Sequence, residues 1–170
     1  MNERRENKEQ QTQAVQELRD KIVLQPELDE NTEDKFLLRF LRAKKFIKDE
    51  AFQLLCNYYK FKRNNKELFT GLTVAELRYV LEDGFPCVLP DGNENGTKIM
   101  VLFAGTWDIE KYQIKEILKA MILSLEEASE IKEVQEEGIF VILDFSGWCS
   151  DHTSQLKVAS LKQIVWIFQV

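Results

Sequence analysis

Apolar residues recur at helical spacing through the first eighty residues of the chain. Four stretches carry such a stripe, at residues 15–22, 35–45, 49–63 and 74–81. Apolar side chains repeated every three or four residues form one face of a helix, and that face packs against a shared core. The charged residues 1–12 lack a stripe, and we expect them to be frayed. The first eighty residues are therefore predicted to be helical.

Two of these helices begin next to residues that are typical of helix caps. Asn31 followed by Asp34 resembles a capping box, with Asp in the usual place of Glu. Thr73 precedes the last stretch, where its hydroxyl can accept a free backbone N–H of the first turn. Helix starts are therefore expected at Lys35 and Val74.

The pattern changes after residue 83, where glycine and proline become frequent. A short apolar piece at 85–89 and a turn at Asn95-Gly96 come first. Two almost continuous apolar runs of strand length follow, at 98–104 and 139–143. Apolar residues on both faces of a strand predict a sheet that is covered on both sides, which favours parallel pairing.

Helical stripes separate and follow these two runs, at residues 112–132 and 153–168. The β-α-β-α order is typical of right-handed crossover units in an α/β domain. The sequence thus predicts an all-helical N-terminal domain, residues 1–83, followed by an α/β domain with a mostly parallel sheet, residues 84–170. Two strands and a short edge piece leave one sheet edge unpaired, which proteins usually avoid. We therefore expect the α/β domain to be incomplete.

Composition argues against several classes of function. A net charge of −6 is unfavourable for general nucleic-acid binding, which requires a basic surface. Three widely spaced cysteines without a CxxC pair, and a single histidine, are too few for a zinc site and indicate free thiols in a reducing compartment. The polar N-terminus lacks the apolar core of a signal peptide, and no apolar stretch is long enough to span a membrane. We therefore expect a cytoplasmic protein without metal or transmembrane segment.

Candidate catalytic residues are few. The phosphate-binding patterns GxxxxGK[ST] and GxGxxG are absent. Asp144 follows the second apolar run, where α/β enzymes often place acids, but the favoured interpretation is a hydrogen bond to the loop at residues 146–148. His152 has no evident serine or cysteine partner at a strand-to-helix turn. An enzyme that uses Asp144 and His152 is the weaker alternative, and we expect no catalytic activity.

Positive charge is concentrated between residues 35 and 66. This segment has two acidic residues and ten basic ones, which are Lys35, Arg39, Arg42, Lys44, Lys45, Lys48, Lys60, Lys62, Arg63 and Lys66. Its charge of +8 within an acidic chain favours contact with anionic lipid, at roughly 1 kcal/mol for each basic residue near the surface. A solvated helical face is the alternative, and the charge count alone does not exclude it.

Five ordered segments carry a more specific signal. Two lie in the helical part and three in the α/β part: Phe36–Phe46, Leu54–Lys60, Val88–Gly96, Trp107-Asp108 and Asp144–Trp148. Together they resemble the CRAL-TRIO family, and within it the branch that contains the alpha-tocopherol transfer protein, the retinaldehyde-binding protein and clavesin. The resemblance extends over about residues 17–169.

This resemblance implies a helical cap and an α/β cage that holds one small hydrophobic lipid, with no catalytic centre and no cofactor. Members of the family carry the lipid inside the cell, and several exchange it at phosphoinositide-containing membranes. The implied lipid-binding positions are Leu118, Met121, Ile122, Leu125, Ile139, Val141, Leu143, Trp148, Ile164, Ile167 and Phe168. Lys44 matches a phosphoinositide-binding position.

The chain departs from the family in two respects. Met121 and Leu125 occupy positions where the tocopherol branch has serines, which leaves a hydroxyl-bearing ligand with fewer polar partners. The family's chain continues beyond residue 170 with further strands, a mobile gate and most of the basic patch. The resemblance therefore predicts a lipid-transfer protein that associates peripherally with membranes from the cytoplasm. The alternative is a truncated helical module that serves interaction or regulation and carries no lipid.

Overall fold

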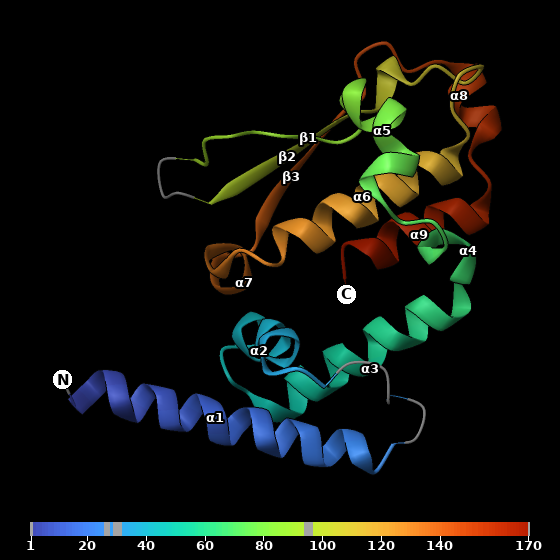
Figure 1. Cartoon of the computed structure of the whole chain (residues 1–170). Coiled ribbons are helices and arrows are strands. Elements are labelled where there is room, and N and C mark those ends of the chain that lie inside the picture. The colour runs from blue at the N-terminus through green and yellow to red at the C-terminus, as the bar shows by residue number, and fades with distance from the viewer. Residues whose placement is uncertain (1, 26–27, 29–31, 94–96, 170) are drawn as a thin grey trace. The chain divides into compact units, whose positions relative to one another are not determined.

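The computed structural model describes the chain, with side chains from residue 8 onward, over residues 2–25, 28, 32–93 and 97–169. The chain divides into two compact units, Met1–Phe61 and Lys62–Val170 (Figure 1). The division falls within a helix, and it lies upstream of the limit predicted from the sequence. The domain limits 1–83 and 84–170 remain predictions.

Three helices form the first unit. They are α1 (Asn2–Val23), α2 (Asp34–Ala43) and α3 (Lys48–Asn64), and the last turn of α3 extends into the second unit. The predicted apolar stripes lie on these helices, so the prediction of a helical N-terminal part is confirmed. The expectation of a frayed segment at residues 1–12 is wrong, because α1 begins at Asn2. Lysine, glutamate and glutamine favour a helix even where no apolar face is present.

The core of the first unit is built from the apolar stripes of its helices. Its most deeply buried side chains are Leu18, Ile22, Leu37, Leu41, Leu55 and Tyr59. Aromatic rings extend this core in edge-to-face contacts, with centroids 5.2 Å apart for Phe36 and Phe40 and 5.7 Å apart for Phe40 and Tyr58. Burial of apolar surface is the main stabilising contribution to this unit.

The second unit contains a small sheet accompanied by helices. Its strands are β1 (Cys87–Val88), β2 (Lys98–Phe103) and β3 (Ile139–Asp144). Its remaining helices are α4 (Lys66–Phe69), α5 (Val74–Glu82), α6 (Ile114–Ala128), α7 (Lys132–Glu137), α8 (Ser150–Gln155) and α9 (Val158–Ile167). β2 and β3 are parallel, whereas β1 pairs with β2 in antiparallel fashion. The α/β prediction and both strands are confirmed, although the sheet is mixed. None of the helices in the described part of the chain is long and apolar enough to cross a bilayer.

The predicted caps and turn have different outcomes. Thr73 caps α5 as predicted, because its hydroxyl oxygen accepts the backbone N–H of Glu76 at 3.3 Å. The cap predicted at Asn31 lies outside the described residues, and so does the turn predicted at Asn95-Gly96.

Two predicted helices are shorter than their stripes. The stripe at 112–132 forms α6, which ends at Ala128, and α7 begins separately at Lys132. The stripe at 153–168 is divided into α8 and α9, because Lys157 adopts an extended conformation with φ −79° and ψ 152°. No glycine or proline marks this break, so the periodic pattern predicts one continuous helix.

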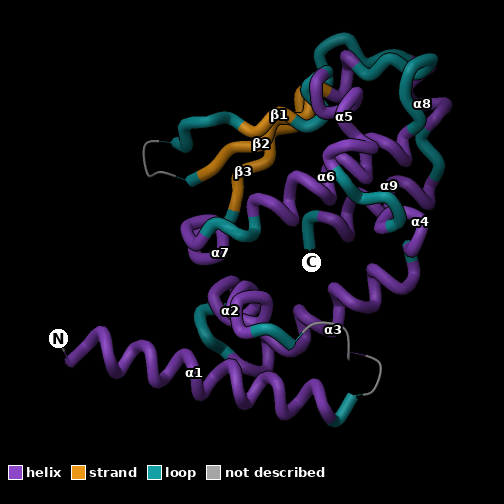
Figure 2. Tube along the Cα trace, viewed as in Figure 1, coloured by secondary structure: helices purple, strands orange, loops and turns teal. Residues whose placement is uncertain are grey.

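The two faces of the sheet differ in their surroundings. Met100 and Leu102 of β2 are buried, and Leu102 lies beside Ile117 and Leu118 of α6. Helix α6 in turn packs against α9 (Figure 2). Phe140 and Ile142 of β3 point to the opposite face and are 57% and 50% exposed. The expectation of a sheet covered on both sides is therefore wrong for β3 in the described residues, whereas Val101 of β2, which pairs with Ile142 on the same face, is 8% exposed.

Truncation of Leu55 tests the core of the first unit. Leu55 is 0% exposed, so Leu55→Ala leaves a cavity and should lower the free energy of unfolding by about 2–5 kcal/mol. Urea denaturation followed by circular dichroism measures this loss. Leu24→Ala makes the same change at a residue that is 78% exposed, and it should cost less than about 0.5 kcal/mol. Equal losses in the two variants would contradict this core.

Candidate functional site

The loops that follow β2 and β3 touch each other at two glycines. A Cβ atom on Gly105 would lie 2.0 Å from the backbone oxygen of Ser146, so only glycine fits there. Gly147 has φ +89°, a conformation that side chains rarely adopt. Because parallel strands end at the same edge of a sheet, this contact joins the two loops directly above that edge. It brings Trp107 and Trp148 together, with ring centroids 6.4 Å apart.

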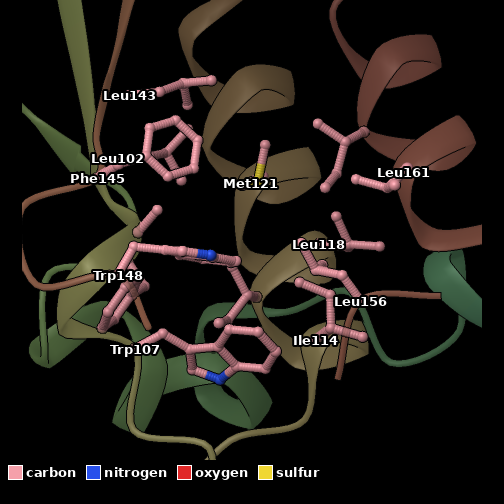
Figure 3. A pocket seen from close by; sticks show the side chains of 14 residues that line it. Leu102, Trp107, Ile114, Leu118, Met121, Leu143, Phe145, Trp148, Leu156 and Leu161 are labelled. Carbon is pink, nitrogen blue, oxygen red and sulfur yellow. The ribbon is translucent and has the colours of Figure 1, made fainter. Parts of the chain in front are cut away.

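An apolar cavity lies beside these tryptophans, with a volume of about 160 Å³. Twelve of its fourteen lining residues come from the ends of β2 and β3, the loops after them, α6 and α9 (Figure 3). The other two are Phe85, between α5 and β1, and Leu156, between α8 and α9. They are Phe85, Leu102, Ala104, Trp107, Ile114, Ile117, Leu118, Met121, Leu143, Phe145, Trp148, Leu156, Leu161 and Ile164. All of them are apolar, so the cavity suits a hydrophobic ligand.

The indole N–H groups of the two tryptophans have partners outside the cavity. Trp107 Nε1 donates to the backbone oxygen of Tyr112 at 2.9 Å, and Trp148 Nε1 donates to Thr153 Oγ1 at 2.9 Å. Each indole therefore offers its ring to the cavity and keeps its polar end satisfied.

The imidazole ring of His152 packs against both tryptophans. His152 is 8% exposed, its ring stacks on Trp148 with centroids 4.9 Å apart, and its Nε2 lies 2.8 Å from the backbone oxygen of Trp107. Its Nδ1 accepts the backbone N–H of Cys149 at 3.0 Å and lies 3.2 Å from Cys149 Sγ. The expectation that His152 lacks a cysteine partner is wrong, because the first turn of α8 brings residues three apart together.

Asp144 behaves as the favoured interpretation expects. Its Oδ1 accepts the backbone N–H of Ser146 at 2.8 Å. Hydrogen bonds from the side chain and backbone of Ser146 lower the pKa of this carboxyl below its ordinary value. Asp144 therefore stabilises the loop that carries Trp148.

A polar network supports Trp107 from behind. The Tyr112 hydroxyl donates to the carboxylate of Asp83 and to the backbone oxygen of Tyr79, and Lys111 pairs with the same carboxylate. The hydrogen bond from Lys111, and after it the one from Tyr112, hold the pKa of Asp83 below its ordinary value of 3.8. Burial is the main cause of the raised pKa of Tyr112. The network anchors Tyr112, whose backbone oxygen in turn holds the indole of Trp107.

Comparison with known protein families agrees with this architecture. Residues 82–170 match the family model of the CRAL/TRIO domain, and residues 7–76 match the model described as Pinta-like, UBA domain. The chain belongs to the CRAL/TRIO family. It is 38% identical over 160 residues to clavesin-2 from Homo sapiens and Rattus norvegicus, and also to clavesin-1 from Xenopus laevis. These alignments include 92% of this chain and 48–49% of the relatives. The chain thus spans about half the length of the curated relatives it matches.

The positions implied by the CRAL/TRIO resemblance fall into two groups. The cavity is lined by Leu118, Met121, Leu143, Trp148 and Ile164. The other positions lie elsewhere in the second unit, and they are Ile122, Leu125, Ile139, Val141, Ile167 and Phe168. Ile122 and Ile167 are buried, whereas Phe168 is 38% exposed. A role in lipid binding remains a prediction for both groups.

The cavity also includes residues that the sequence analysis did not select. These are Phe85, Leu102, Ala104, Trp107, Ile114, Ile117, Phe145, Leu156 and Leu161. A signal existed for some of them, because Ile114 and Ile117 continue the helical stripe that contains Leu118 and Met121. Trp107 and Phe145 lie within segments that carry the family resemblance.

Lys44 lies at the end of α2 and is half-buried. Its backbone N–H donates to Phe40 O at 3.2 Å, and the next residue, Lys45, is exposed with φ +49°. The phosphoinositide-binding role of Lys44 remains a prediction.

Removal of the Tyr112 hydroxyl tests the network behind Trp107. Tyr112→Phe should lower Tm near neutral pH, because the Asp83 carboxylate and the Tyr79 carbonyl both lose a donor. The pKa of Asp83 is lower in the folded state than in the unfolded state. The ionised carboxylate therefore stabilises the folded state above about pH 4, and this stabilisation is lost as the pH falls through the folded-state pKa. Thermal melts should show the difference from wild type shrinking below about pH 4. A difference independent of pH would contradict the carboxylate contact.

Proposed function

We propose that this protein binds a small hydrophobic lipid and transfers it inside the cell without catalysing a reaction. The observation that carries the proposal is the cavity, whose lining side chains are apolar and whose two indole N–H groups have partners elsewhere. A site that offers no polar group to position or activate a reacting atom supports binding rather than catalysis. Membership of the CRAL/TRIO family supports the same function.

The size of the cavity constrains which part of the lipid it holds. Its volume of about 160 Å³ is similar to that of an engineered cavity, about 150 Å³, that binds benzene in another protein. We propose that one ring-sized or short branched apolar end of the lipid occupies it, while the rest extends beyond these walls. A hydroxyl in this space would lose its hydrogen bonds to water at a cost of roughly 1–3 kcal/mol. The buried end is therefore an unsubstituted hydrocarbon.

We further propose that the protein acts in the cytoplasm and associates peripherally with phosphoinositide-containing membranes. The charge of +8 between residues 35 and 66 supports attraction to an anionic surface. Lys44, which matches the family's phosphoinositide-binding position, lies within this segment beside the exposed Lys45. Each basic side chain near the surface adds to binding, so the interaction should weaken as salt screens it.

Two aspartate variants of α9 test lipid binding in the cavity. Leu161 lines the cavity and is 46% exposed, so Leu161→Asp keeps the helix soluble but brings a carboxylate to the cavity wall. We expect affinity for the fluorescent fatty acid cis-parinaric acid to fall about tenfold or more, since burying an unpaired charge beside a lipid costs several kcal/mol. Fluorescence titration of the full chain measures the change.

Val165→Asp is the matched control for this experiment. Val165 lies one turn later on α9, is 55% exposed and is not part of the lining, so its variant should bind the fatty acid as wild type does. Equal affinity in all three proteins would place the lipid outside this cavity. Failure of wild type to bind any lipid probe, or to co-purify with lipid detected by mass spectrometry, would favour the interaction module instead.

Charge reversal at Lys44 tests membrane association. Lys44→Glu should reduce flotation with liposomes that contain bisphosphorylated inositides more than Lys132→Glu does, because Lys132 lies outside the basic segment. Binding should also decrease between about 0.05 M and about 0.3 M salt. Equal losses of liposome binding in the two variants would show that the basic segment is a solvated helical face without a specific role in membrane binding.

A further inference from the structure

A thiol and an imidazole face each other at the start of α8. Cys149 Sγ lies 3.2 Å from His152 Nδ1, and Cys149 is exposed to solvent. The other two cysteines, Cys56 and Cys87, are half-buried. Neither Cys149 nor His152 lines the apolar cavity, but Trp148 does, and it precedes Cys149 in the chain and stacks on His152. The pair is therefore an accessible nucleophile with a base, next to an apolar wall.

The hydrogen bonds of His152 determine which nitrogen is basic. The backbone oxygen of Trp107 can only accept a hydrogen bond, so Nε2, which lies 2.8 Å from it, carries the proton. Nδ1 therefore carries the lone pair, which accepts the backbone N–H of Cys149 and also lies within reach of its thiol. A nucleophile within reach of a base that a third group orients is the arrangement that activates thiols in enzymes.

Two further contacts of His152 bear on proton transfer from Cys149. The indole of Trp148 stacks on the imidazole at 4.9 Å with an interplanar angle of 28°, and tryptophan is the best aromatic partner for a cation. Before the transfer, the backbone N–H of Cys149 donates to Nδ1 at 3.0 Å. A proton on Nδ1 would take away this acceptor, which opposes the transfer. The two effects oppose each other, so the activation should be moderate.

We propose that Cys149 is a covalent modification site for α,β-unsaturated aldehydes that carry an apolar tail. The Sγ proton moves to His152 Nδ1, and the sulfur forms a bond to the β-carbon of the aldehyde. The electron pair of the carbon–carbon double bond passes to the α-carbon, which then takes the proton back from Nδ1. The product is a saturated aldehyde thioether, and the addition consumes no oxidant and releases no leaving group.

Apolar side chains next to Cys149 favour a tailed aldehyde over a short one. Phe145 is 54% exposed and packs edge-on against Trp148, with ring centroids 5.4 Å apart. An alkyl tail that lies on these rings leaves water and holds the reactive carbon near the thiol. This site does not depend on lipid transfer, since it requires only the thiol, the imidazole and the adjacent rings.

The rate of adduct formation in the folded and unfolded chain tests the proposal. The full chain is treated with trans-2-nonenal near pH 7, natively and in guanidinium, and the adduct on each cysteine is quantified by peptide mass spectrometry after borohydride reduction. Cys149 should react about tenfold faster in the folded chain. Cys56 and Cys87 should react more slowly when folded. Solvent exposure alone cannot make a cysteine react faster in the folded chain than in the unfolded chain. A folded-to-unfolded rate ratio of one or less at Cys149 would therefore overturn the proposal.

Two variants and a second aldehyde separate the contribution of the imidazole from that of the apolar tail. His152→Gln should bring the Cys149 ratio to about one or lower, whereas Cys87→Ser should leave it unchanged. An unchanged ratio in folded His152→Gln would overturn the role of the imidazole, and if that variant fails to fold, the wild-type ratio decides. Propenal, which has no tail, should show a smaller ratio than trans-2-nonenal. Equal ratios for the two aldehydes would overturn the preference for an apolar tail.

Discussion

The contact between the loops after β2 and β3 determines where the functional groups of the second unit lie. Gly105 leaves no room for a side chain beside the backbone of Ser146, so the two loops approach to a distance that only glycine permits. That approach brings Trp107 and Trp148 together. One tryptophan then holds the imidazole of His152 through its carbonyl, and the other stacks on it. The cavity wall and the thiol–imidazole pair are thus two sides of one aromatic cluster.

Separation of polar and apolar surfaces keeps these two sides distinct. The indole N–H groups are satisfied by Tyr112 and Thr153, so the rings present only carbon surface to the cavity. Tyr112 is in turn fixed by Asp83, whose carboxylate accepts the Tyr112 hydroxyl. The polar groups of the unit therefore stabilise the cavity without entering it, and a hydrophobic ligand meets no group that would prefer water.

The sequence was most informative where one local pattern dominated. The continuous apolar runs predict β2 and β3, and Thr73 predicts the start of α5, because burial and capping act on neighbouring residues. Cavity residues from loops, such as Phe85 and Leu156, follow no period, because tertiary contacts place them. The pairing of Cys149 with His152 is a tertiary detail of the same kind, because it depends on a helix that begins at Ser150, whereas the periodic pattern predicts a start near Thr153.

The break between α8 and α9 has a mechanical consequence. Leu156 lies at this break and lines the cavity, and the next backbone residue, Lys157, is extended. A continuous helix would couple Leu161 and Ile164 rigidly to the aromatic cluster through its ladder of backbone hydrogen bonds. Here this ladder is interrupted between Gln155 and Val158, so Leu161 and Ile164 are held beside the aromatic cluster by side-chain packing and by the contact of α9 with α6. The position of the cavity wall at Leu161 is therefore set by tertiary contacts and not by the backbone of α8.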